Sequence, residues 1–195
     1  MIAGHFGLAA GVKRSAPAAP LWALMLATAW LDVVFVPLFL AGIETIEPVP
    51  GTAGGYGQGI IHADYTHSLV GAAALAVVFG AVAAIPWGRR TGIVLGAVVF
   101  SHWLLDLIVH RADLPILPGG AGDLPRLGFG LWRVPAGAAL LELAIVLAGA
   151  WLYWLAAREV ARRRTPSGFW RQPATLAGLI LVAGIVTLAV DFFVA

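Results

Sequence analysis

Long runs of apolar residues, separated by short segments rich in glycine, proline and arginine, dominate the chain. A helix needs about 20 consecutive apolar residues to cross a bilayer. The runs of at least this length are residues 20–41, 67–87, 91–110, 134–157 and 173–195. The apolar run at 2–12 is too short to span a membrane, so we expect a short helix packed inside the protein. The pattern predicts an all-α polytopic membrane bundle with about five transmembrane helices and a short N-terminal membrane helix.

Composition supports this fold class. The chain is 61% apolar and 11% charged over 195 residues, whereas soluble domains have about 45–50% apolar and about 25% charged residues. These values exclude a water-soluble domain, and they exclude disorder, which needs low hydrophobicity and high charge. We expect one integral membrane domain over 1–195, in which 1–120 form a metal-site core and 121–195 add two transmembrane helices. The absence of cysteine excludes disulfides, thiolate metal ligands and a cysteine nucleophile.

Basic residues are distributed unequally between the connections. Nine lie on one side of the predicted spans: Lys13, Arg14, Arg89, Arg90, Arg158, Arg162, Arg163, Arg164 and Arg171. Three lie on the other: Arg111, Arg126 and Arg133. The positive-inside rule places the larger group in the cytoplasm, and Trp22, Trp87, Trp154 and Trp170 lie near the same ends. We therefore expect a bacterial inner-membrane protein with the Lys13/Arg14 segment in the cytoplasm and no nucleic-acid partner.

Histidine and aspartate gather in the half of the chain's spans that lies away from the cytoplasmic loops. His102 and Asp106 are four residues apart in a predicted span and share one helix face, which His110 continues. An aspartate near the bilayer centre costs about 2.5–3.5 kcal/mol, so it needs a partner. A divalent cation is an efficient partner, and a buried His–Asp hydrogen bond that only holds helices together is the alternative.

Further polar residues are predicted at a similar depth. At 1.5 Å per residue, His5 and Asp32 fall in the same band, about two turns deep, as the His102/Asp106 pair. His62 and His67 flank a polar turn that begins the next span, and Thr66 and Ser68 are typical N-cap residues. The shared depth predicts one metal site, with these candidate ligands: His5, Asp32, His62, His67, His102 and Asp106.

The order and spacing of four segments resemble the motifs of the YdjM-like family. These segments are Gly4-His5, Trp30-Leu31-Asp32-Val33-Val34, His62 to Ser68, and Ser101-His102 to Asp106. The family is described as membrane-bound metal-dependent hydrolases, distantly similar to zinc-dependent phospholipase C. The resemblance covers about residues 1–120. It departs from the family where Val34 replaces a second acid and where Ala63 and Asp64 replace Arg-Gly.

The resemblance and the polar residues together predict a metal-dependent hydrolase of a phosphoester-type or lipid-linked substrate at the outer side of the membrane. Zinc is the first expected metal and manganese the second, since His and Asp ligands suit both. Asp64 is the candidate general base, and His110 and Arg111 are candidate substrate-binding residues. Two alternatives remain: a structural or partner-binding membrane protein with a polar or metal cluster, and a metal-ion or proton transporter.

Overall fold

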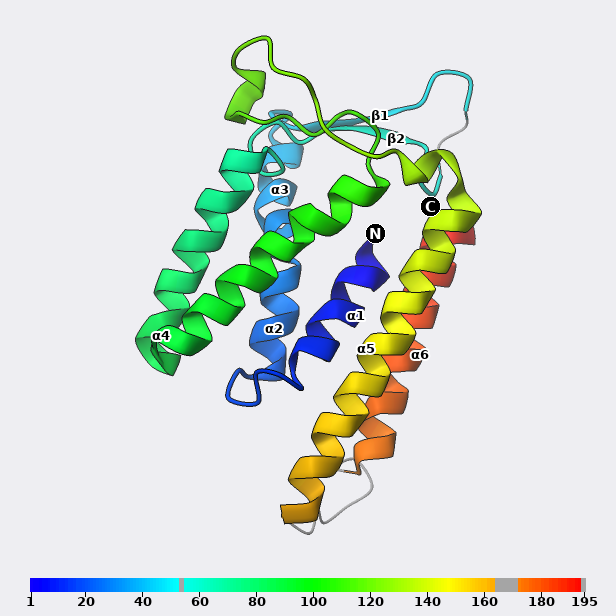
Figure 1. Cartoon of the computed structure of the whole chain (residues 1–195). Helices are drawn as coiled ribbons and strands as arrows, with labels where there is room; N and C mark the ends of the chain where they lie inside the picture. The colour runs from blue at the N-terminus through cyan, green and yellow to red at the C-terminus, as the bar shows by residue number, and fades with distance from the viewer. Residues whose placement is uncertain (53–54, 164–171, 194–195) are drawn as a thin grey trace.

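The computed structural model describes residues 1–52, 55–163 and 172–193. Three residues used to predict the orientation, Arg164, Trp170 and Arg171, lie outside this part of the chain. The protein is mostly helical (Figure 1). Its helices are α1 (Ile2–Val12), α2 (Leu21–Thr28), α3 (Trp30–Leu40), α4 (Leu69–Val109), α5 (Pro135–Arg163) and α6 (Pro173–Phe193). Two strands, β1 (Thr45–Pro48) and β2 (Gly59–His62), and two 3₁₀ turns, η1 (Pro118–Gly120) and η2 (Leu131–Arg133), complete it.

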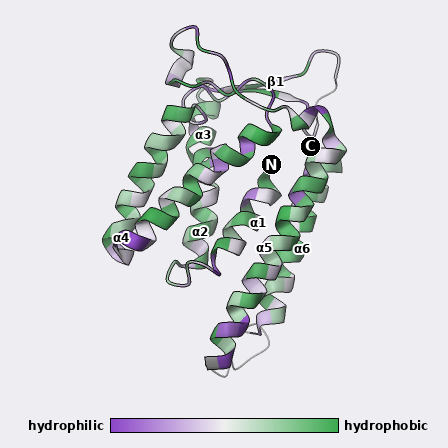
Figure 2. Cartoon of the chain, in the orientation of Figure 1, coloured by the Kyte–Doolittle hydropathy of each residue, from purple (hydrophilic) through white to green (hydrophobic). Residues whose placement is uncertain are grey.

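The helices carry their apolar side chains outward as well as inward. Ile85 is 84% exposed, Leu140 67% and Ile93 62%. Figure 2 shows hydrophobic residues along most of each helix and hydrophilic ones mainly at the turn of α4 and the far end of α5. A soluble protein does not expose so much contiguous apolar surface. The helices therefore fit a membrane, as the sequence predicts.

Fewer helices meet the length and composition of a membrane span than the sequence predicts. Among the described residues, α4, α5 and α6 are long and apolar enough to cross a bilayer, and the α2–α3 pair adds a fourth span if it counts as one. The prediction of about five spans is not confirmed on this basis. The difference arises at α4, a single element that covers two of the predicted runs.

A turn at Gly88 folds α4 back on itself. Gly88 has φ 80° and ψ 160°, which a residue with a Cβ rarely adopts. The two arms lie side by side (Figure 1), and small residues let their backbones approach closely. A Cβ on Gly80 would lie 2.8 Å from the backbone oxygen of Gly92, and one on Gly96 would lie 2.8 Å from that of Ala76. Both ends of α4 therefore reach the same end of the molecule.

A second break separates α2 from α3. The two helices are bent by 47° at Ala29. This break places Asp32 in the first turn of α3, and it leaves the Thr28 carbonyl free to accept a hydrogen bond from outside the helix. The span predicted at 20–41 is thus two short helices rather than one.

The short helix α1 lies in the middle of the bundle, against α2, α4, α5 and α6 (Figure 1). It packs on α5 through glycine. A Cβ on Gly7 would lie 2.8 Å from the Cα of Val146, and one on Gly149 would overlap the backbone oxygen of Gly7. This close approach places α1 beside α5 and brings His5 to the end of the bundle where α4 begins and ends.

That end is covered by irregular segments and a small hairpin. Strands β1 and β2 pair antiparallel, with Ile46 opposite Ile61, and the segment after α4 runs over them (Figure 1). Ser68 is the N-cap of α4, and its side chain accepts a hydrogen bond from the Gly71 amide at 3.0 Å, which confirms the prediction for Ser68. Thr66 does not cap the helix, because its hydroxyl contacts Glu44 and His67 instead.

The α1–α5 contact predicts a position-specific effect of alanine. Gly149→Ala should lower the free energy of unfolding by about 1–3 kcal/mol, because the new methyl group displaces α1. Gly178→Ala in α6 is the matched control, since a Cβ there meets nothing within 4 Å. Thermal unfolding in detergent measures both. Equal melting temperatures for the two variants would contradict this packing.

Candidate metal centre

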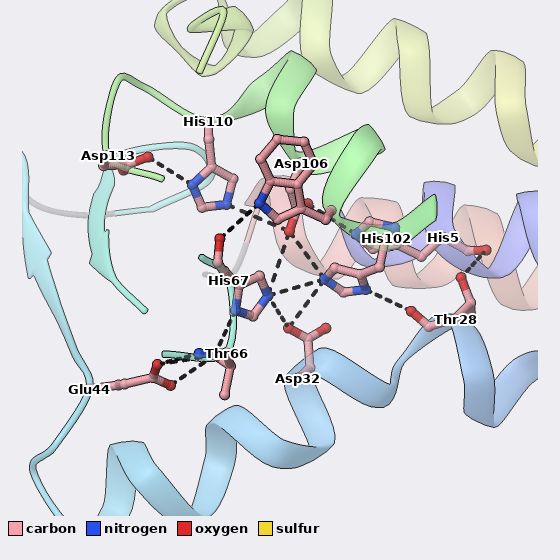
Figure 3. Close-up of polar contacts among 11 residues, drawn as sticks. His5, Thr28, Asp32, Glu44, Thr66, His67, His102, Asp106, His110 and Asp113 are labelled. Atoms are coloured by element: carbon pink, nitrogen blue, oxygen red, sulfur yellow. Dashed lines mark hydrogen bonds and ion pairs between the residues drawn. The ribbon is translucent and has the colours of Figure 1, made fainter. Parts of the chain in front are cut away.

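Four elements bring histidine and aspartate side chains to one point beneath the hairpin. His5 comes from α1, Asp32 from α3, His67 from the turn before α4, and His102 and Asp106 from its second arm (Figure 3). The Nε2 atom of His102 lies at the centre. It is 3.1 Å from Asp106 Oδ2, 3.3 Å from His67 Nε2 and 3.6 Å from Asp32 Oδ1. We call these five residues the His/Asp cluster.

Both oxygens of Asp106 face imidazoles. Oδ1 is 3.1 Å from His5 Nε2, whereas Oδ2 lies 3.7 Å from His67 Nε2 and 3.8 Å from His110 Nε2 in addition to its contact with His102. The rings of His5 and His102 stack with centroids 3.8 Å apart. The expected His102/Asp106 pairing on one helix face is thus present, and Asp106 holds the cluster together.

Oxygen acceptors fix the ring orientation of two histidines. The Nδ1 of His102 is 2.6 Å from the Thr28 carbonyl, which the break between α2 and α3 exposes. The Nδ1 of His110 is 2.9 Å from Asp113 Oδ1. Since a carbonyl and a carboxylate only accept, each Nδ1 carries the proton and donates it. The Nε2 atom of each ring therefore points toward Asp106, and in the neutral ring it is the nitrogen free to bind a cation.

A third histidine is oriented through a threonine. Glu44 is fully buried and accepts hydrogen bonds from the Tyr65 and Thr66 amides at 2.8 and 2.9 Å. It also accepts the Thr66 hydroxyl, at 2.9 Å. With its proton directed to Glu44, the Thr66 oxygen accepts from His67 Nδ1 at 2.8 Å. In the neutral ring, His67 Nε2 is therefore also the nitrogen free to bind a cation.

These tautomers give the cluster its chemical character. The lone pairs of His67 and His102 face each other across 3.3 Å, an arrangement that repels unless a proton or a cation lies between them. Two nitrogens bound to one tetrahedral zinc at about 2.0–2.1 Å are separated by about 3.3–3.4 Å. With neutral imidazoles, Asp32 and Asp106 give the cluster two negative charges, which a divalent ion balances. The residues therefore fit a divalent metal ion.

The geometry contains two overlapping groups that can each hold an ion. One consists of His5, His102 and Asp106, and the other of Asp32, His67 and His102. In His67 and His102, an oxygen atom accepts a hydrogen bond from Nδ1 and orients the ring. Histidines that bind a metal through the other nitrogen are usually oriented in this way. His5 differs, because its Nδ1 is buried without a hydrogen-bond partner among the described residues.

One side of the cluster is accessible. The histidine side chains and that of Asp106 are at most 5% exposed, whereas the Asp32 side chain is 45% exposed. It faces a cavity of about 330 Å³. The His/Asp cluster and His110 form its polar lining, and the apolar lining comprises Met1, Ile2, Phe35, Ile46, Ile61 and Trp132. One part of the cavity lining is thus polar and able to bind an ion, and the rest is apolar.

The structure does not bring His62 into this cluster. Its Nε2 lies 3.9 Å from Glu47 Oε2, in a half-exposed contact on the hairpin. Successive side chains of a strand point to opposite faces. Because Ile61 lines the cavity, the adjacent His62 faces away from it.

Asp64 and Arg111 also lie outside the cavity lining. Both Asp64 oxygens bind Arg126, at 2.8 and 3.2 Å, and this hydrogen-bonded pair raises the pKa of the Arg126 guanidinium. Arg111 donates to the Gly57 carbonyl at 2.9 Å. The structure therefore places these two residues in the outer segments, where each joins distant parts of the chain.

A buried glutamate in α5 positions α1. Glu142 is fully buried; one oxygen accepts from the Gly4 amide at 3.1 Å and the other from the Tyr56 hydroxyl at 2.5 Å. Burial and this hydrogen bond raise the pKa of Tyr56. Glu142 satisfies an amide in the first turn of α1, which otherwise has no partner within the helix. The residue next to that amide is His5, so Glu142 helps to place a member of the cluster.

The sequence did not predict that four residues orient the cluster. These residues are Thr28, Glu44, Asp113 and Glu142. Asp113 follows His110 by three residues, and this spacing is a signal that could have found it. Glu44 is 22 residues from Thr66, and Thr28 is 74 residues from His102. Nothing local in the sequence indicates those two contacts.

No family model, curated protein or solved structure matches the chain. The fold and the site nevertheless define a class of protein. It is a helical protein with apolar helices that fit a membrane and a buried His/Asp cluster that can hold a metal ion. The resemblance to the YdjM-like family stays a prediction from its motifs.

The role of Glu44 predicts a strong and local effect on stability. Glu44→Ala should lower the free energy of unfolding by at least about 2 kcal/mol, because buried donors lose their acceptor. Glu47→Ala, on the neighbouring strand, is the control, since its side chain is 67% exposed. Chemical denaturation in detergent measures the difference. A loss no larger than that of the control would contradict the role of Glu44.

Proposed function

We propose that this chain is an integral membrane protein that binds a divalent metal ion at the His/Asp cluster and hydrolyses a phosphoester-type bond in a lipid or lipid-linked substrate. The observation that carries the proposal is the convergence of the Nε2 atoms of His67 and His102, 3.3 Å apart, with the carboxylates of Asp32 and Asp106 beside an open cavity. The Nδ1 hydrogen bonds of both rings leave these Nε2 atoms available to bind a cation when the rings are neutral.

The proposed ligands are His5, Asp32, His67, His102 and Asp106. Zinc is the first candidate and manganese the second, because both accept imidazole and carboxylate ligands. When bound, such an ion polarises a phosphoryl oxygen and lowers the pKa of bound water. Thr28, Thr66 and Asp113 keep the imidazoles in the required tautomer.

The shape of the cavity supports an amphiphilic substrate. Phe35, Ile46 and Ile61 offer apolar contacts to a lipid chain beside the exposed carboxylate of Asp32. His110 lies in the lining, held by Asp113, and can contact the polar part of a substrate. A scissile bond near the membrane interface would reach the cluster without complete extraction of the lipid.

Two observations count against the alternatives. Below the cluster, Leu24, Leu31, Leu95 and Val99 are fully buried and pack together, which disfavours a transport path toward the other side. A purely structural cluster would be sealed, whereas Asp32 is open to the cavity. An enzyme fits both observations better than a transporter or a structural protein.

We further propose five membrane crossings, formed by the α2–α3 pair, each arm of α4, α5 and α6. An arm of about 20 residues covers about 30 Å, the thickness of the hydrocarbon core. The excess of basic residues then places the Lys13/Arg14 segment in the cytoplasm of a bacterial inner membrane and the cluster toward the outer side.

The metal proposal predicts different outcomes for two aspartates. Asp106→Asn should remove most bound zinc, because it replaces the carboxylate that contacts His5 and His102. Asp64→Asn should retain zinc, since Asp64 pairs with Arg126 outside the cavity lining. Elemental analysis of purified protein, loaded with zinc or manganese and then dialysed, measures metal per chain.

Hydrolysis is tested on the same preparations with a phosphodiester lipid in mixed micelles, by phosphorus NMR. We expect headgroup release that chelation and Asp106→Asn abolish. Loss of turnover in Asp64→Asn with zinc retained would support the predicted base. Zinc binding without turnover on phosphoester substrates would leave a metal protein and refute the hydrolase, whereas zinc content equal to that of a no-metal control would refute the site itself.

The orientation is tested on a background that contains no cysteine. Asp123→Cys, in the exposed segment after α4, should react with a membrane-impermeant maleimide in intact cells. Ser15→Cys, exposed in the α1–α2 connection, should react only after permeabilisation. The reverse pattern would invert the proposed topology.

A further inference from the structure

A second cavity, remote from the His/Asp cluster, has a basic lining. It has a volume of about 510 Å³ and lies between the α1–α2 connection and the last turns of α5. Arg14, Arg158 and Arg162 line it together with Glu159. Its apolar lining comprises Pro17, Leu155, Ala156 and Val160. Arg162 lies 3.6 Å from the Glu159 carboxylate, so among the described lining residues Arg14 and Arg158 add an excess of positive charge beside an apolar surface.

The loop side of this cavity is built by a lysine. The Lys13 ammonium donates to the backbone carbonyls of Pro17 at 2.8 Å and Ala19 at 2.6 Å. These hydrogen bonds fold the α1–α2 connection back toward Lys13. Pro17, in this connection, lines the cavity. Lys13 is therefore occupied within the loop, while the adjacent Arg14 lines the cavity.

Aromatic residues place the cavity at the depth of a membrane interface. Arg158 lies over the ring of Trp154, 4.4 Å from its centroid. Trp22, in the first turn of α2, and Trp87, beside the turn of α4, contact each other edge to face with ring centroids 5.4 Å apart. Tryptophan rings concentrate where lipid headgroups meet the hydrocarbon. The contact with Trp154 is thus typical of an arginine near lipid phosphates, and it places Arg158 where such a group could be bound.

We propose that this cavity binds the phosphate of an anionic phospholipid. Arginine guanidinium groups match phosphate oxygens in pairs, and Leu155 and Val160 offer apolar contacts to the adjoining glycerol and acyl carbons. Basic cavities between helices at an interface are suited to such headgroups. This site shares no residue with the His/Asp cluster, so it is independent of the proposed hydrolase.

The experiment compares lipid retention by native mass spectrometry of the purified full chain. Protein is incubated with phosphatidylglycerol or phosphatidylcholine and then delipidated stepwise. We expect phosphatidylglycerol to be retained preferentially, and Arg158→Gln or Arg14→Gln to lower its affinity about fivefold each. Arg90→Gln is the matched control, since Arg90 is an exposed arginine beside the turn of α4 that does not line this cavity. Zinc content should be unchanged in all three variants.

Three results would overturn the proposal. Equal retention of phosphatidylcholine would show that no anion is selected. An equal loss with Arg90→Gln would show a general charge effect. Displacement of the lipid by an equal concentration of inorganic phosphate would assign the cavity to free phosphate. Arg14 lies in an exposed connection, so its variant keeps the test decisive if Arg158→Gln does not fold.

Discussion

The structure depends on the burial of one carboxylate, that of Asp106, among apolar helices. Such a group is costly in a membrane unless charged or hydrogen-bonding partners surround it. Its two oxygens contact the imidazoles of His5, His67, His102 and His110, which come from separate parts of the chain. The central position of α1, the break at Ala29 and the return of α4 each bring one of these partners or its support into place. The packing of the helices and the placement of the site residues therefore depend on the same contacts.

The sequence predicted what local spacing and hydropathy control. The apolar runs predicted a helical membrane protein, and the four-residue spacing predicted that His102 and Asp106 share a face. It did not predict contacts that a broken or folded helix creates. The Thr28 carbonyl is available to His102 only because the first predicted span is bent. His62 was grouped with the ligands because β2 was not expected, and the alternation of a strand turns it away from the cavity.

The acids in and around the cluster have two different roles, which their positions in the sequence do not distinguish. Glu44 and Glu142 accept backbone amides at the starts of a turn and a helix, so they order the chain around the cluster. Asp32 and Asp106 face imidazoles instead. All four lie in or beside apolar runs. Only the tertiary contacts show which acids accept hydrogen bonds from backbone amides and which face imidazoles that can bind a cation.

The turn at Gly88 has a consequence for how the protein can change over time. His67 precedes the first arm of α4, and His102 and Asp106 lie near the end of the second, so the cluster closes only when both arms have matching lengths. Adding one residue to either arm rotates everything beyond it by about 100° and shifts it by about 1.5 Å. Such a change would turn a ligand out of the site while leaving the hydropathy of the helix intact. The two arms of α4 must therefore keep matching lengths. We expect insertions to be tolerated more readily in the outer segments than between residues 68 and 102.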